Sequence, residues 1–194
     1  MQTLPKRSAL RAAALLAFVA LFAGCSHEKT FTNPNMDFGS IHNVVVLPFW
    51  NLTKDQQAAD RVRDVYTTAL LATNAVYVIP TGETARAVQR LNIQTPVTPT
   101  TEDVVKLCAL LKADAVITGV LKEYGEVRSA AASGNVISLS LQMQEASAGK
   151  VVWSGASTKG GVGWAARLLG TAGGRPVNDV IEDAVDDLLA QMLR

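Results

Sequence analysis

Residue types that commonly carry catalysis or bind metals are scarce in this chain of 194 residues. It contains two cysteines and two histidines, His27 and His42. A histidine-based metal site or a Ser-His-Asp array needs more partners than these. The G-x-x-x-x-G-K-[ST] phosphate loop and the G-x-S-x-G nucleophile elbow are missing as well. We therefore predict a protein that is not an enzyme and that holds neither a metal nor a cofactor.

Long apolar runs are absent, apart from a short one near the start of the chain. Residues Ala12 to Gly24 form an apolar stretch of thirteen residues, which is short of the roughly 20 needed to cross a bilayer. Three basic residues and no acidic residue come before or within it. A basic segment, a short apolar segment and small residues at its end are the parts of a secretory signal peptide.

The stretch Leu21 to Cys25, LFAGC, resembles the lipobox of bacterial lipoproteins, although Phe22 stands where that motif usually has leucine. The resemblance implies that residues 1–24 are removed and that Cys25 is acylated. Ser26, rather than aspartate, follows the cysteine, which implies transfer to the outer membrane. The protein is then held by lipid at the periplasmic face of that membrane. The alternative is an ordinary signal peptide with a chance cysteine.

The mature chain has little excess charge. Without the leader, 15 basic residues stand against 17 acidic ones. Nucleic-acid binding needs concentrated lysine and arginine, so we expect no nucleic-acid partner. Only Cys108 remains once Cys25 is acylated, which excludes an intramolecular disulfide. Cys108 lies on an apolar helical face and is predicted to be a buried small hydrophobe.

The rest of the chain alternates between strand and helix patterns. Residues 25–40 are polar, with asparagine, proline and glycine, and are predicted to be a lipidated tether. Residues 41–194 are predicted to form a single α/β domain with a mixed sheet of about five strands, three to four helices, and the helices on one side. Strands are expected at 43–50, 75–80, 113–127, 135–146 and 151–158. Helices are expected at 55–72, 82–91, from Thr100 or Thr101 to 111, and 176–193.

Two segments stand out as candidate interaction sites. Acidic residues gather in the last helix, at Asp179, Glu182, Asp183, Asp186 and Asp187. They form either a cation or partner site or the solvated face of an amphipathic helix.

The second candidate segment is the glycine-rich stretch 155–174, which carries an apolar island with Trp164, Arg167, Leu168 and Leu169. The island is expected to meet the membrane interface, a neighbouring subunit or the domain's own core.

Three stretches carry a family resemblance: NVVVLPFWNLT, LLKADAVITGVLKEYGEV and the hairpin ending in AGKVVWSG. They are similar to bacterial lipoproteins with the fold of the TolB amino-terminal domain, a group that includes the CsgG, LpoB and PelC lipoproteins. The similarity covers about residues 41–193. The short connection VRSAAASGN leaves no room for the long membrane-spanning hairpins of CsgG, so the chain is more similar to PelC.

This resemblance implies two alternative functions. The first is an oligomeric outer-membrane lipoprotein that assists export or assembly of an envelope polymer, such as an exopolysaccharide. In that case Trp164 faces the membrane or a ring neighbour, and the acidic face guides a cationic polymer. The second is a monomeric lipoprotein that binds and activates an envelope enzyme such as a peptidoglycan synthase.

Overall fold

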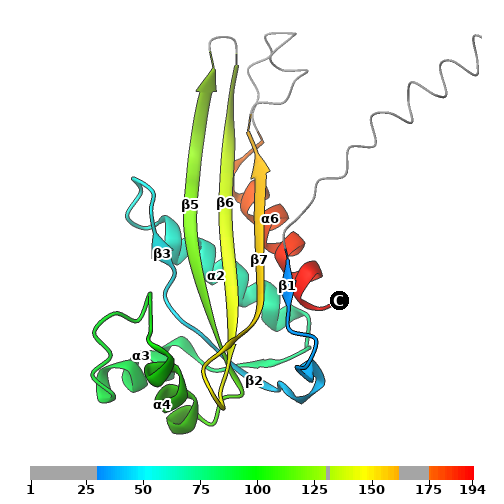
Figure 1. The fold of residues 1–194 in the computed structure, drawn as a ribbon. Coiled ribbons are helices and arrows are strands. Elements are labelled where there is room, and N and C mark those ends of the chain that lie inside the picture. The colour runs from blue at the N-terminus through cyan, green and yellow to red at the C-terminus, as the bar shows by residue number, and fades with distance from the viewer. Residues whose placement is uncertain (1–29, 130–131, 162–174) are drawn as a thin grey trace, which may run out of the picture.

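The computed structural model describes residues 30–129, 132–161 and 175–194, which form a mixed sheet with helices packed against it (Figure 1). The seven strands described are β1 Phe31–Thr32, β2 Asn43–Val46, β3 Trp50–Asn51, β4 Tyr77–Val78, β5 Ala115–Ser129, β6 Ala132–Glu145 and β7 Val151–Gly160. The four α-helices within these residues are α2 Ala58–Ala72, α3 Thr81–Arg90, α4 Thr101–Leu111 and α6 Val177–Met192, and a 3-10 turn, η1, covers Phe38–Ser40. The predicted α/β class is confirmed. The sheet has two more strands than predicted, and both, β1 and β3, are only two residues long.

The sheet joins a parallel part to an antiparallel part. The strand order is β1-β7-β6-β5-β2-β4, and β3 pairs with β5 beyond the end of β2. β2 runs parallel to both β4 and β5, whereas β5, β6 and β7 form an antiparallel meander whose outer edge pairs with β1. The long β5–β6 hairpin extends well beyond the parallel part of the sheet (Figure 1).

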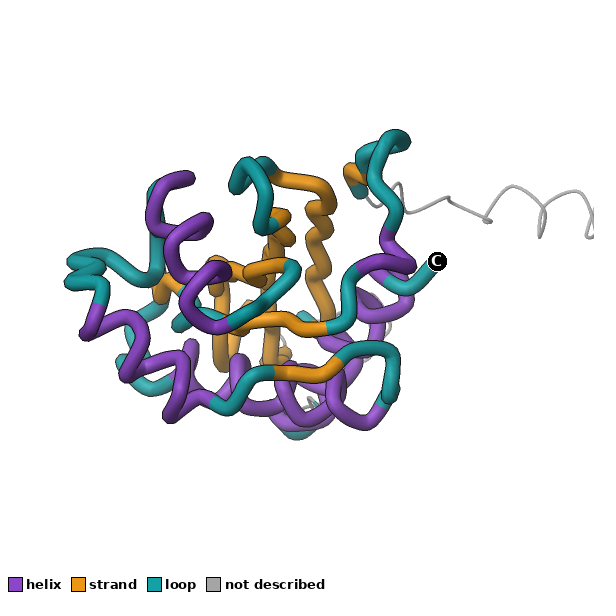
Figure 2. Tube along the Cα trace, turned by 90° about the horizontal axis from the view of Figure 1, so that it is seen from below, coloured by secondary structure: helices purple, strands orange, loops and turns teal. Residues whose placement is uncertain are grey.

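Helices cover both faces of the parallel part, so the prediction of helices on one side is wrong. Val44 and Val46 of β2 pack into a core with α2 and α6, whereas Val45 and Leu47 pack into a second core with α3 and α4. The helices accordingly lie on both sides of the strands (Figure 2). The physical reason is that β2 carries three consecutive buried valines, Val44 to Val46, and a strand with apolar side chains on both faces needs cover on both.

The folded part of the chain begins earlier than residue 41. The main-chain N–H of Asn33 donates to the carbonyl of Val152, and β1 adds to the edge of β7. The Thr30 hydroxyl donates to Oε1 of Gln191 on α6 at 2.7 Å. Met36 and Phe38 pack against the larger core. Residues 30–40, which the sequence pattern placed in the tether, are therefore packed onto the domain.

The start of α4 agrees with the sequence pattern. The Thr100 side chain accepts a hydrogen bond from the main-chain N–H of Asp103, and the Asp103 carboxylate accepts one from the N–H of Thr100. The hydrogen bond from the Thr100 hydroxyl is the main cause that lowers the pKa of Asp103. Two N–H groups at the helix start are satisfied in this way. Of the two predicted capping residues, Thr100 is the N-cap, and α4 itself begins at Thr101.

Candidate functional site

One face of the meander is polar and only partly covered. Along β6, four apolar residues are buried toward α6, as their alternation predicts: Ile137, Leu139, Leu141 and Met143. The intervening residues point to the opposite side, where they join residues of β5 and β7. We call this surface the polar sheet face; it consists of Thr118, Ser138, Ser140, Gln142, Gln144, Ser154 and Thr158. The Ser138 and Thr158 hydroxyls are hydrogen bonded to each other at 2.9 Å.

A cleft of about 290 Å³ lies between the polar sheet face and the loop before α4. Trp50 lines its edge, on β3 opposite Val120 of β5. The tryptophan is 46% exposed. Thr98 and Pro99 line the other side of what we call the Trp50 cleft.

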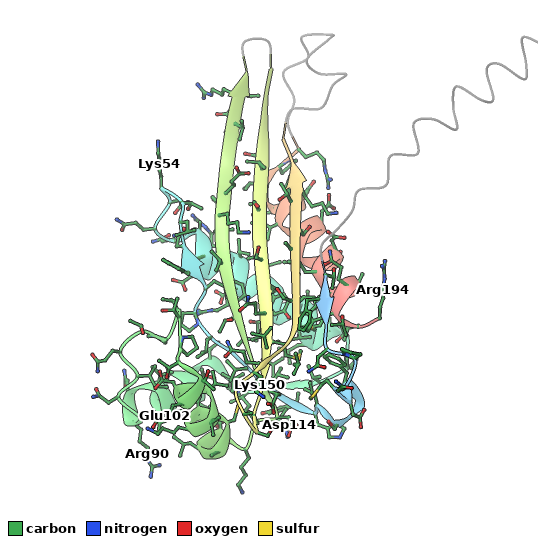
Figure 3. All side chains as sticks on the ribbon, in the orientation of Figure 1. Lys54, Arg90, Glu102, Asp114, Lys150 and Arg194 are labelled. Atoms are coloured by element: carbon green, nitrogen blue, oxygen red, sulfur yellow. The ribbon has the colours of Figure 1, made fainter. Side chains whose placement is uncertain are left out.

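The lining of the Trp50 cleft carries hydroxyl and amide groups and no charged side chain. Charged side chains such as Arg90 and Glu102 instead lie at the outer end of the α3–α4 layer (Figure 3). An aromatic face next to neutral donors and acceptors suits an uncharged polyhydroxylated ligand. The cleft lining contains no paired nucleophile and base. The arrangement therefore suits binding.

Sequence reasoning did not single out Trp50, because it stands at the end of an apolar strand run. The run in fact stops at Val46 and resumes two residues after Pro48 as a separate strand on the other part of β5. Proline within a strand pattern was the available signal for that break.

The acidic residues of α6 divide into two groups. Asp187 forms an ion pair with Lys159 at 2.8 Å and accepts a hydrogen bond from the Ser157 hydroxyl. Asp183 forms an ion pair with Arg175. The hydrogen bond from the Arg175 guanidinium to the Asp183 carboxylate is the main cause of the lowered pKa of Asp183. Three of the five predicted residues remain exposed: Asp179, Glu182 and Asp186.

A groove of about 490 Å³ separates α2 from α6. Asp64 of α2 lines it together with Glu182 and Asp186 of α6, and the small side chains of Ala69 and Ala72 form part of its lining. Two of the three exposed acidic residues of α6, Glu182 and Asp186, therefore line a helix–helix groove. In the described part of the chain, no group of three or more histidine, cysteine, aspartate or glutamate residues is arranged to hold a metal ion.

Cys108 lies in the core between α4 and the sheet, where only 2% of its surface is exposed. Burial is the main cause that raises the pKa of its thiol to about 12. The thiol is therefore protonated at neutral pH and is no nucleophile. This agrees with the prediction of a small buried hydrophobe.

The remaining predicted site residues lie outside the described residues. They are the lipidation residue and the four members of the glycine-rich island, namely Cys25, Trp164, Arg167, Leu168 and Leu169. Among the helices of residues 30–129, 132–161 and 175–194, none is long and apolar enough to cross a membrane.

The fold is shared with solved structures of three bacterial proteins, one of them a lipoprotein by its description. A PelC dodecamer from Paraburkholderia phytofirmans has 16% sequence identity and a TM-score of 0.57, with 85% of this chain and 95% of that chain covered. Lipoprotein GNA1162 from Neisseria meningitidis has 18% identity and a TM-score of 0.57, with 78% and 98% covered. The hypothetical protein CT253 from Chlamydia trachomatis has 14% identity and a TM-score of 0.52, with 79% and 96% covered. Identities this low establish the fold alone.

The sequence itself identifies the family within this fold class. The model of the GNA1162-like lipoproteins matches residues 38–189. The chain belongs to the GNA1162-like lipoprotein family. No curated protein sequence matches the chain. The predicted relationship to lipoproteins of the PelC type of fold is thus confirmed.

Proposed function

We propose that this protein is a non-catalytic lipoprotein at the periplasmic face of the outer membrane, held there by acylated Cys25. In this role it assembles into an oligomer that assists the export or assembly of an envelope polymer. Two findings together support this proposal. The lipoprotein family model matches residues 38–189, and the fold is shared with PelC, which was solved as a dodecamer.

The polar sheet face supports a role in guiding a polymer. An exposed tryptophan and neutral hydroxyl and amide groups bind a sugar without removing water from a charged side chain, so the free-energy cost of desolvation is small. Such contacts also form and break easily, so a chain of sugars is able to move along the surface. The exposed acidic residues of α6 supply a second, separate surface for a cationic polymer or a basic partner segment. The two surfaces lie on opposite faces of the sheet, since α6 packs on its apolar side.

Lipid anchoring is tested by Cys25→Ser. This variant lacks the only acceptor thiol of the proposed lipobox, so we expect incorporation of labelled palmitate to be lost and the lipid mass to be missing. Because each buried methylene stabilises membrane attachment by about 0.8 kcal/mol, loss of the acyl chains removes the anchor. Cys108→Ala is the matched control and should keep full labelling. Palmitate on the Cys25→Ser variant would contradict the anchor.

Oligomer formation is tested by native mass spectrometry of residues 26–194. We expect a discrete high-order oligomer that Trp164→Ala weakens, because tryptophan is a common anchor of subunit interfaces. Trp50→Ala is the matched control, since it truncates the same residue type at the proposed polymer cleft and should leave the assembly unchanged.

The other outcomes of this measurement distinguish the alternatives. A strictly monomeric chain at high concentration would overturn the oligomer and favour a monomer that activates an envelope enzyme. An oligomer that is indifferent to Trp164→Ala would keep the oligomer but assign the glycine-rich island to the membrane interface or to the domain's own core.

A further inference from the structure

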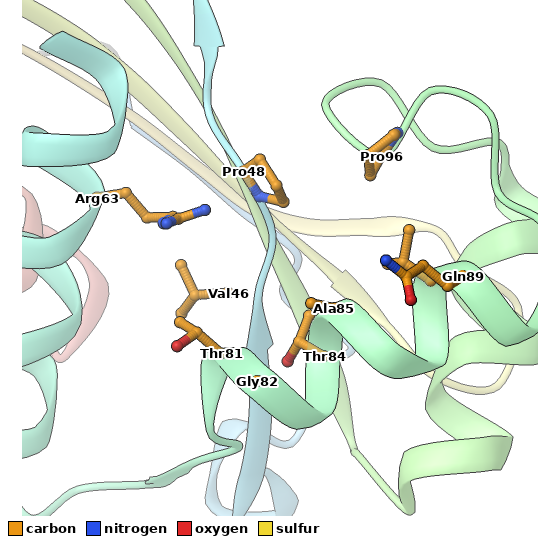
Figure 4. A pocket seen from close by; sticks show the side chains of 10 residues that line it. Val46, Pro48, Arg63, Thr81, Gly82, Thr84, Ala85, Gln89 and Pro96 are labelled. Carbon is orange, nitrogen blue, oxygen red and sulfur yellow. The ribbon is translucent and has the colours of Figure 1, made fainter. Parts of the chain in front are cut away.

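A second cavity, whose lining shares no residue with the Trp50 cleft, lies at the carboxyl ends of the parallel strands. Its volume is about 460 Å³, and it is bounded by α2, the end of β2, the start of α3 and the loop at Pro96 (Figure 4). We call it the Arg63 cavity, after the α2 residue that reaches into it. In open α/β sheets, ligands commonly bind at the carboxyl ends of parallel strands. The volume falls within the range of small-molecule sites, about 300–1,000 Å³.

Buried polar atoms without partners concentrate around this cavity. Thr84 lines it from α3, is only 4% exposed, and its hydroxyl has no hydrogen-bond partner among the described residues. Nε of Arg63 is also buried without a partner. A third such atom, the hydroxyl of Thr67, lies one helical turn from Arg63 on α2. Leaving such groups unpaired is costly, so they indicate that a ligand completes the site.

The first turn of α3 adds main-chain donors. Pro80 occupies the N-cap position and makes no side-chain cap, whereas the Thr100 cap of α4 does. A Cβ built on Gly82 would meet nothing within 4 Å, so open space lies beside its backbone. N–H groups at a helix start and the helix dipole together favour an anion.

The charge of the cavity lining agrees with an anionic ligand. Arg63 is the one charged residue of the lining, and 18% of its side chain is exposed. Its ion pairs to Asp60 and Asp64, through Nη2, are long, at 3.5 and 3.6 Å, and both carboxylates are largely exposed. Such contacts contribute little, so they leave the guanidinium available to a closer anion. Glu83, the acidic residue in the first turn of α3, lines a different pocket with Arg86.

We propose that the Arg63 cavity binds a water-soluble phosphate monoester. Its donors come from three directions: the Arg63 guanidinium, the first turn of α3 and the Thr84 hydroxyl, which turns about its χ1 angle to reach the ligand. A tetrahedral phosphate with three terminal oxygens matches donors from three directions better than a planar carboxylate does. Val46 and Val88 offer apolar contacts to the body of the ligand.

The test uses residues 25–194 with the substitution Cys25→Ser. This protein is titrated separately with inorganic phosphate and with glycerol phosphate, and binding is monitored by NMR of the backbone amides. Chloride keeps the ionic strength constant. We expect saturable shifts of the Thr81 and Gly82 amides. Arg63→Gln should weaken binding about tenfold or more, because it removes a charge-assisted contact. Arg86→Gln, on α3 but outside the lining of the cavity, should leave the affinity unchanged.

Thr84→Val separates a binding role from a structural one. It removes the unpaired hydroxyl at nearly constant size, so the domain stays folded while phosphate binding weakens. The proposal is overturned if the Thr81 and Gly82 amides do not shift saturably, or if Arg63→Gln and Arg86→Gln lose affinity equally. It is also overturned if Thr84→Val leaves the affinity as it was.

Discussion

Replacing Trp153 with alanine is expected to destabilise the domain by about 3–5 kcal/mol, the usual cost of truncating a buried aromatic residue. Trp153 is 1% exposed and is among the largest fully buried side chains, within the core between the sheet and α6. The cavity left behind cannot close easily, because the indole is held between β7 and the end of α6 near Gln191. Urea denaturation of wild type and variant measures the change in the free energy of unfolding.

Trp153→Phe is the informative comparison. The Nε1–H group of Trp153 is buried without a hydrogen-bond partner among the described residues. Phenylalanine keeps most of the ring and removes this unpaired donor, whose burial costs about 1–3 kcal/mol. We therefore expect Trp153→Phe to cost much less than Trp153→Ala. Equal losses in the two variants would show that the indole N–H has a partner or that the ring volume is dispensable.

Replacing Gly160 with alanine is expected to be the second most damaging change. Gly160 ends β7 with φ of +84°, and an added Cβ would lie 2.1 Å from the carbonyl oxygen of Asn135. A side chain at positive φ costs about 1–2 kcal/mol, and overpacking typically adds about 1–3 kcal/mol. The carbonyl of Asn135 has little freedom to move, since it accepts the main-chain N–H of Gly161. Thermal and urea unfolding should both report the loss.

Gly161→Ala is the matched control for that overlap. Gly161 has nearly the same backbone angle, with φ of +86°, but a Cβ there would meet no atom of the described residues within 4 Å. It should therefore cost only the conformational strain, about 1–2 kcal/mol. If the two variants are equally destabilised, the overlap with Asn135 is relieved by movement and the explanation from steric overlap is wrong.

Local patterns in the sequence were sufficient for most of the elements. The alternation in β6 predicts which residues are buried, because neighbouring side chains of a strand point to opposite faces. The apolar stripe of α6 predicts the face that packs inward, and it consists of Val177, Val180, Ile181, Ala184, Leu188 and Met192. Val185 and Leu189 widen the buried surface beyond this predicted stripe. Thr100 marks the start of α4 because its capping partner lies three residues away.

The candidate sites, by contrast, depend on residues that are distant in sequence. Trp50 meets Ser140 and Gln142 only because β3 pairs with β5 and β5 with β6. Arg63 and Thr84 share a cavity because α2 and α3, which pack against opposite faces of β2, both reach the end of that strand at Val46 and Pro48. The periodicity of apolar residues along one helix or strand does not predict these contacts between distant residues. They depend on the order of the strands in the sheet and on which helix covers which face.

By itself the sequence determined the α/β class and the inward faces of β6 and α6, since each depends on neighbours within a few residues. The leader and the acylation of Cys25 stay predictions from the sequence. Only the tertiary structure decided that helices cover both faces of β2, that residues 30–40 pack onto the domain, and that Asp183 and Asp187 are paired while Asp186 is exposed. The physical reason is that burial and charge pairing are set by what the whole chain brings together, whereas periodicity records only which side of an element is apolar.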